Sequence, residues 1–166
     1  NEAKGANLRM FRHIRSKLDE ANTQLGTDRG EAPDAKGRGF RFSHVMAIAP
    51  NASSSIIMGN TSPSIEPFRA NAYRQDTLSG AYLNKNKYLD KMITEYCEKH
   101  PRTNYDEVWS NIISNDGSVQ HLTQLTDEQK AIFKTSMEID QRWLVEHAAD
   151  RQEYIDQAQS LNLFFR

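Results

Sequence analysis

The sequence lacks several features on which common classes of protein depend. Its single cysteine, Cys97, excludes an internal disulfide framework. No apolar run approaches the roughly 20 residues that a membrane-spanning helix needs, and the N-terminus lacks the basic and then apolar pattern of a signal peptide. The five histidines show no spacing typical of metal ligands, so we predict no metal site. We therefore expect a cytoplasmic protein without a membrane partner.

The apolar content is low and the charges nearly balance. Lysines and arginines number 21 against 22 aspartates and glutamates, and the net charge of -1 gives no general attraction to nucleic acid. Hydrophobic residues make up 37% of the chain, which predicts a modest core. There is no internal repeat and no low-complexity segment. The chain begins at Asn1 rather than methionine, so we expect it to be processed or to be a piece of something longer.

One stretch, residues 44–67, carries the clearest functional signal. Residues 45–49 are small and apolar without alternation, which predicts a strand buried on both faces, and Pro50 ends it by removing a donor. Small residues with several free N–H groups follow at 51–55, before the apolar residues 56–58. If those apolar residues begin a helical turn, the free N–H groups form an anion site that fits a phosphate. Alternatively, Asn51 and the serines only cap the turn.

The order of residues in this stretch resembles that of a known enzyme family. Pro50, the small residues 51–55 and the later run Ile65, Glu66, Pro67 are similar to the substrate-phosphate loop of the large, catalytic subunit of class I ribonucleotide reductases. The resemblance covers nearly the whole chain, continuing through residues 77–80, 115–120, 140–143 and 157–165.

The resemblance implies a role within a larger enzyme. The chain would be a section, from the C-terminal half, of the family's ten-stranded α/β barrel, and the whole enzyme would reduce ribonucleoside diphosphates by a thiyl-radical mechanism. Substrate phosphates would bind chiefly to backbone N–H groups of Asn51, Ala52, Ser53 and Ser54, with Ser55 adjacent. No catalytic residue is implied here, because the family's Asn-x-Cys-x-Glu finger loop, redox cysteine pair and Tyr-Tyr dyad are absent from this sequence. We expect the chain alone to be inactive.

The resemblance also implies partners. The whole enzyme would need the remainder of the large subunit, a radical-generating small subunit that contains a metal, and allosteric effectors of the ATP type. This chain itself would bind the ribonucleoside diphosphate and no cofactor. The alternative is a free-standing helical phosphate-binding or interaction module without catalysis.

Periodicity and capping signals predict a helix-rich α/β chain with four or five helices and two buried strands. The expected segments are a helix over 1–25, ended by Gly26; a loop over 26–43; the strand and phosphate loop over 44–67; a helical region over 68–159; and a terminal strand over 161–165. Because two strands cannot cover each other's edges, we expect them to belong to a larger barrel, incomplete on its own.

Four helix starts are predicted inside the helical region. Asn86 caps a helix that ends before Pro101, and a short helix follows over 105–113. A capping box of Thr126 and Gln129 begins the best-defined helix. This helix is expected to bury its apolar stripe, which includes Phe133 and Trp143 and comes close to Asp140; a second acidic box then begins a last helix at Asp150.

Other reactive residues are expected to be structural. Glu66 can be considered as a general base, but a base would repel a bound phosphate, so we favour a buried carboxylate that shapes the loop. His44 is interpreted as a hydrogen-bonded structural residue and Cys97 as a buried thiol. Tyr73 and Tyr82 are interpreted as packing aromatics.

Overall fold

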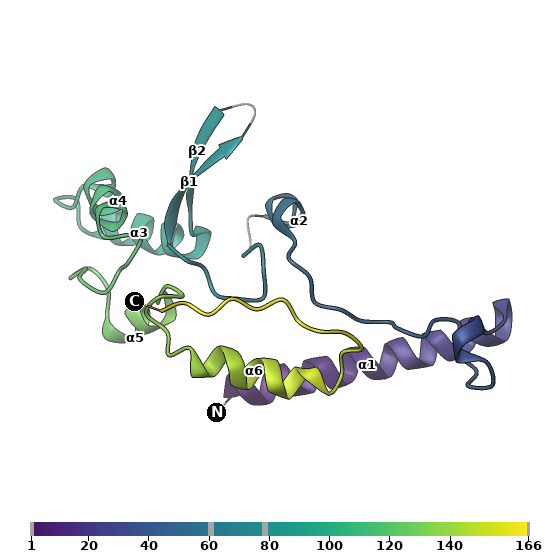
Figure 1. Ribbon diagram of the computed structural model, residues 1–166. Coiled ribbons are helices and arrows are strands. Elements are labelled where there is room, and N and C mark those ends of the chain that lie inside the picture. The colour runs from purple at the N-terminus through teal and green to yellow at the C-terminus, as the bar shows by residue number, and fades with distance from the viewer. Residues whose placement is uncertain (1, 60–61, 78–79, 166) are drawn as a thin grey trace. The chain divides into compact units, whose positions relative to one another are not determined.

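The computed structural model describes residues 2–59, 62–77 and 80–165, which form two compact units (Figure 1). The first unit contains the residues up to Asn51 together with Asp140–Leu163. The second contains Ala52–Ile139 and the residues from Phe164 on. Helices dominate both units, and a single two-stranded sheet is described. The predicted helix-rich α/β class is therefore confirmed at this level.

In the first unit two helices lie side by side. Helix α1 (Glu2–Arg29) packs along α6 (Arg142–Gln152), and Figure 1 shows the shorter helix following the N-terminal part of the longer one. Phe11 of α1 is buried against Tyr154 and Ile155, which follow α6. This small apolar cluster is the core of the unit and holds the C-terminal segment on α1.

Helix α1 does not end at Gly26, as the sequence predicted, but continues to Arg29. Gly26 is buried because the following loop crosses it closely: a Cβ atom at Gly26 would lie 2.1 Å from the carbonyl oxygen of Gly39. Asn22, one turn earlier, donates to the Phe42 carbonyl at 2.8 Å and accepts from the Phe42 N–H at 2.7 Å. The glycine is needed for this contact rather than for a helix stop.

The close contact predicts opposite effects of alanine at two glycines of the same helix. Gly26→Ala should lower the free energy of unfolding by about 1–3 kcal/mol, because the new methyl group meets backbone that cannot move aside. Gly5→Ala should raise it by up to about 1 kcal/mol, since only the flexible end of Arg9 lies nearby, at 3.2 Å. Thermal unfolding of both variants checks this. If both variants change the free energy of unfolding equally, the loop does not contact Gly26.

Neither predicted buried strand forms a regular strand within the described residues. Residues 45–49 are extended, but their one ladder contact there is an isolated parallel bridge between Ile48 and Gln159. Ala47 and Ala49 are exposed, and residues 161–165 have no regular structure. An apolar run without alternation of apolar and polar residues forms a regular strand only when neighbouring strands pair with it. Within the described residues, this segment pairs through one isolated bridge.

The strands that are present lie where the sequence predicted helix. In the second unit, β1 (Ala72–Thr77) and β2 (Gly80–Lys85) form an antiparallel hairpin, with Ala72 opposite Lys85 and Thr77 opposite Gly80. The six residues of β1 show no clean alternation of apolar and polar side chains. The pairing of the two segments, rather than local preference, therefore makes these strands.

Two predicted helices are confirmed beside the hairpin. Helix α3 (Lys87–Lys99) is capped by Asn86, whose side chain accepts from the N–H groups of Tyr88 and Leu89, and it ends before Pro101. Helix α4 (Tyr105–Ser114) follows. Their inner faces meet in the core of the second unit, which is formed by Ala72, Leu89, Ile93, Val108, Trp109, Ile112, Val119, Leu122, Leu125 and Phe133.

The predicted capping box is confirmed, but the helix that it begins is short. Gln129 N–H donates to the Thr126 hydroxyl at 3.3 Å and Thr126 N–H to the Gln129 side chain at 2.9 Å. Helix α5 (Asp127–Ile132) then stops. The chain turns because Glu138 accepts the N–H of Thr135 at 2.8 Å, a side-chain contact that competes with the helical pattern.

This early stop corrects two expectations, on Trp143 and Asp150. Phe133 is buried as predicted, but Trp143 belongs to α6 and is 41% exposed rather than buried. Asp140 is exposed and accepts from the N–H and guanidinium of Arg142. Asp150 lies inside α6 and does not begin a new helix.

Candidate functional site

The residues predicted to bind phosphate lie where the extended segment passes into α2 (Ala52–Ile57). The helix begins earlier than the predicted turn at 56–58, so Ser53, Ser54 and Ser55 lie within it rather than ahead of it. The first N–H groups of an α-helix have no partner inside the helix. The backbone donors assigned to phosphate therefore belong to the first turn of α2.

The side chains around this turn differ in exposure. Ser53 and Ser54 are exposed, whereas Ser55 is 6% exposed and buried. Asn51 is exposed, and its side-chain nitrogen donates to the carbonyl of Ala49 at 2.9 Å. Asn51 is thus fastened to the extended segment that precedes it, while the two exposed hydroxyls are small and accessible.

Glu66 is buried, with 4% of its surface exposed. Its backbone carbonyl accepts from the Ser62 hydroxyl at 2.7 Å. The burial agrees with the interpretation of Glu66 as a residue that shapes the loop, and it argues against a base that is open to substrate.

The histidine and cysteine candidates lie in structural surroundings. His44 is exposed and its ring lies 3.2 Å from the Ser43 hydroxyl. Cys97 is half-buried and packs against the core of the second unit. The ring of His100 stacks on Tyr96 and is hydrogen-bonded to the Tyr96 carbonyl at 2.8 Å, so its Nδ1 is engaged away from the thiol.

The two tyrosines differ from each other. Tyr73 is half-buried, in keeping with its predicted packing role. Tyr82 is 54% exposed, so the prediction that it packs is wrong for the described chain. It lies on β2, where the hairpin presents it to solvent.

Metal-binding and membrane-spanning features are both absent from the described part of the chain. No group of three or more His, Cys, Asp or Glu side chains among these residues could hold a metal ion. No helix within residues 2–59, 62–77 and 80–165 is long and apolar enough to cross a membrane.

A polar cluster that the sequence did not predict joins three segments of the first unit. The Asp156 carboxylate accepts from the Arg15 guanidinium at 2.6 Å through one oxygen. Its other oxygen accepts from the backbone N–H groups of Val45 at 2.8 Å and Met46 at 3.0 Å. The Asp156 N–H donates in turn to the Met46 carbonyl at 3.1 Å. One side chain therefore connects α1 to the segment that leads towards Asn51.

The electrostatics of this cluster favour an ionised Asp156. Burial alone raises the pKa of this carboxyl, but the N–H of Val45, the guanidinium of Arg15 and the N–H of Met46 together lower it by more, so the pKa lies below its ordinary value. The pKa of Arg15 is raised by its hydrogen bonds to Asp19 and Asp156, despite the opposing effect of burial. The pair therefore stays charged at neutral pH.

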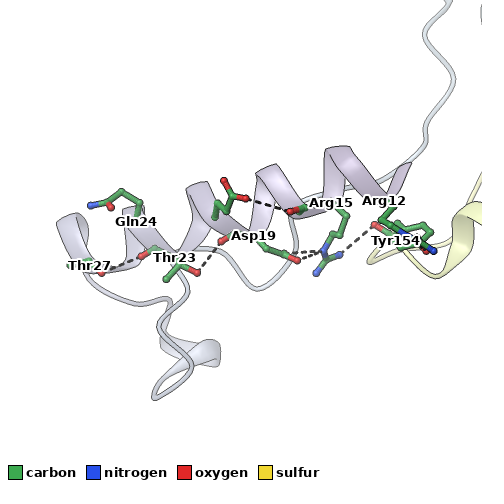
Figure 2. A pocket seen from close by; sticks show the side chains of 9 residues that line it. Arg12, Arg15, Asp19, Thr23, Gln24, Thr27 and Tyr154 are labelled. Atoms are coloured by element: carbon green, nitrogen blue, oxygen red, sulfur yellow. Dashed lines mark hydrogen bonds and ion pairs between the residues drawn. The ribbon is translucent and has the colours of Figure 1, made fainter. Parts of the chain in front are cut away.

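A shallow hollow of about 760 Å³ runs along the same face of α1 (Figure 2). Figure 2 shows Arg12 beside Tyr154, whose hydroxyl accepts from the guanidinium at 3.3 Å, and Arg15 beside Asp19, with the two at 2.9 Å. The charged groups along the hollow are thus paired with neighbours, which is typical of a solvated helix surface rather than of a binding site for a charged ligand.

The sequence contained a signal for this cluster. Arg15 lies four positions after the buried Phe11 and therefore on the same side of the helix. Asp156 directly follows the buried Ile155. An acidic and a basic residue that both adjoin buried positions are expected to pair when those positions meet.

The family model described as "Ribonucleotide reductase, barrel domain" matches residues 12–166. The chain is 55% identical over 168 residues to the "Ribonucleoside-diphosphate reductase large subunit" of Invertebrate iridescent virus 6, covering 100% of this chain and 17% of that protein. It is 56% identical over 159 residues to the large subunit of the same name from Invertebrate iridescent virus 3, covering 96% of this chain and 25% of that protein.

A solved structure is also similar. The "class Id ribonucleotide reductase alpha subunit" of Actinobacillus ureae aligns with a TM-score of 0.83 and 43% sequence identity, over 98% of this chain and 28% of that one. The chain thus spans between 17% and 28% of the length of these relatives.

Proposed function

Because the chain belongs to the ribonucleotide reductase family, as a section of its barrel domain, we propose that it forms part of a ribonucleoside-diphosphate reductase large subunit and binds the substrate's phosphates. The observation that carries this proposal is the family match over residues 12–166, together with 55% identity to a viral reductase large subunit. In the whole enzyme, ribonucleotides would be reduced to deoxyribonucleotides by thiyl-radical chemistry inside a ten-stranded barrel.

We place the phosphates at Asn51, Ala52, Ser53 and Ser54, with Ser55 behind them. The first turn of α2 supports this assignment, since the first N–H groups of a helix have no partner inside it and the helix dipole favours negative charge there. Ser53 and Ser54 are small and exposed, which leaves room for a ligand. The cap-only alternative explains the same serines without a ligand, so a binding measurement must distinguish the two.

The chemistry itself would be supplied by other parts of the enzyme. Cys97 packs against the core, and this sequence contains no second thiol. The remainder of the large subunit would therefore hold the radical and redox cysteines, and a metal-containing small subunit would generate the radical. Effectors of the ATP type would act on the whole large subunit. The role of this chain is to bind and orient the diphosphate.

Removal of one backbone donor tests the phosphate site. Proline is well tolerated at the first position of a helix, so Ala52→Pro should keep α2 while deleting the N–H of residue 52. Loss of one hydrogen bond to a charged group should weaken nucleoside-diphosphate binding by roughly 1.5–3 kcal/mol, or about 10- to 150-fold. Ser53→Ala, which keeps every backbone donor, should weaken binding less than about tenfold.

Binding should be measured in a complete large subunit that carries residues 1–166. Such a protein can be made by placing this chain in the Invertebrate iridescent virus 6 subunit, where the aligned section is 55% identical. Ionic strength must be constant between variants, because screening alters binding of an anion. If Ala52→Pro folds and binds the diphosphate with unchanged affinity, the proposed phosphate site is wrong and Asn51 and the serines serve only as a helix cap.

A further inference from the structure

We infer that Asp156 is a positioning residue for substrate binding: by holding the N–H groups of Val45 and Met46, it fixes the extended segment that ends at Asn51. The inference rests on the phosphate site proposed above. It adds a residue that lies about a hundred positions away in sequence and that would act through the backbone rather than by touching the substrate.

The geometry of Asp156 supports a positioning role. The two carboxylate oxygens bind different partners. One accepts from Arg15 at 2.6 Å, and the other accepts from both N–H groups, at 2.8 Å and 3.0 Å. A carboxylate held by three donors on two separate segments has little freedom to rotate. The N–H groups it binds therefore have a defined place relative to α1.

A second attachment follows along the same two segments. Ile48 forms a parallel bridge with Gln159, and the Ser160 N–H donates to the Ile48 carbonyl at 3.3 Å. The Gln159 side chain accepts from the buried Arg151 at 2.5 Å and donates to the Ala148 carbonyl at 2.8 Å. The run from Asp156 to Ser160 thus fastens residues 45–48 at both ends.

From this fastened segment only a few residues remain before the proposed site. Asn51 follows Ile48 by three positions, and its side chain is itself hydrogen-bonded to the Ala49 carbonyl at 2.9 Å. Residues 45–48 lack the regular ladder of a central strand within the described residues. Within the described part of the chain, side-chain and backbone contacts from 156–160 therefore hold this segment.

Asp19 is a second carboxylate that contacts Arg15. Comparing it with Asp156 distinguishes positioning of residues 45 and 46 from a purely electrostatic effect on Arg15. Asp19 contacts the Arg15 guanidinium at 2.9 Å, but its side chain is 43% exposed and it lies within α1 itself. Asp156 contacts the same guanidinium and also binds residues 45 and 46. The two aspartates therefore form a matched pair for experiment.

The test compares Asp156→Asn with Asp19→Asn in the complete large subunit assayed with its small subunit. Asparagine keeps the shape of Asp156 but loses the charge that binds three donors, so we expect KM for the ribonucleoside diphosphate to rise by about tenfold with kcat changed less than about threefold. Asp19→Asn should leave both constants within about twofold of the parent.

The readout separates positioning from stability. A merely structural role would lower the thermal midpoint and the amount of active enzyme, but would leave KM of the folded protein unchanged, and that result would overturn the inference. If Asp156→Asn does not fold, Arg15→Gln decides: it leaves the carboxylate and its two N–H bonds but removes their orienting partner. A rise in KM of about threefold would then support the inference, and an unchanged KM would overturn it.

Failure of this inference can be told from failure of the phosphate site. If Ala52→Pro weakens binding while Asp156→Asn does not, the site stands and Asp156 has no positioning role. If neither variant changes binding, the site proposed at residues 51–55 is itself wrong, and the inference falls with it.

Discussion

The purified 166-residue chain should convert no ribonucleoside diphosphate to its deoxy form, even with an external thiol present. An external thiol can supply the two electrons that replacing a hydroxyl group by hydrogen takes, but the radical that the proposed mechanism needs would come from the small subunit, which this assay omits. The chain itself has one cysteine. That cysteine, Cys97, is half-buried against the core of the second unit. Incubation of labelled substrate with the chain, followed by separation of ribo- and deoxyribonucleotides, measures the result.

Two controls make this expectation sharp. The complete large subunit carrying the same residues, assayed with its small subunit, should be active. In that enzyme Cys97→Ser should retain activity within about threefold, because the thiol serves packing rather than chemistry. Thiol-dependent turnover by the isolated chain that disappears in Cys97→Ser would show instead that this cysteine is catalytic.

The second large effect concerns the two tryptophans. Trp109 is 2% exposed in the core of the second unit, so Trp109→Ala should lower the free energy of unfolding by about 3–5 kcal/mol. Trp143 is 41% exposed on α6, and Trp143→Ala should cost less than about 1 kcal/mol. Urea denaturation of the chain, followed by circular dichroism so that neither variant loses its signal, measures both.

A further variant separates ring volume from hydrogen bonding. The indole N–H of Trp109 is buried and has no hydrogen-bond partner among the described residues. Trp109→Phe keeps most of the buried ring and removes this unpaired donor, so it should cost less than half as much as Trp109→Ala. It also weakens the contact of the Lys85 ammonium, which lies 4.8 Å from the Trp109 ring centroid. If Trp109→Phe lowers the free energy of unfolding as much as Trp109→Ala does, the shape of the indole ring rather than its buried area determines the stability.

Local signals in the sequence predicted local features well. The side chains of Asn86, Thr126 and Gln129 bind N–H groups within three residues of themselves, so their roles as caps needed no distant partner. The helices after Asn86 and over the residues following Asn104 also lie close to their predicted positions. In these cases the residues that determine the structure are adjacent in the sequence.

Features that depend on distant contacts were not predictable in the same way. Gly26 was interpreted as a helix stop because glycine usually ends helices, whereas its real constraint is the Gly39 carbonyl thirteen positions later. The helix from Thr126 was expected to continue because apolar residues recur, but Glu138 binds back to Thr135. The strands of the hairpin depend on each other and carry no clear pattern of their own.

The candidate site likewise combines features that local sequence predicted with one that depends on distant contacts. The small residues at 51–55 could be singled out from sequence and from a family resemblance, and α2 now gives their first-turn donors a definite place. The binding role itself stays a prediction. Asp156 was missed because its partners lie more than a hundred positions away, at Val45, Met46 and Arg15.

The division of the chain into units has a consequence for the order of folding. The second unit's core lies within residues 72–133, a continuous stretch, whereas the first unit joins α1 to residues that follow position 139. The contact between Lys4 and Glu146, for example, closes a separation of 142 positions. Closing so long a loop is slow compared with local contacts. The contacts of Phe11 with Tyr154 and Ile155 therefore form late in synthesis, after the core of the second unit has all of its residues.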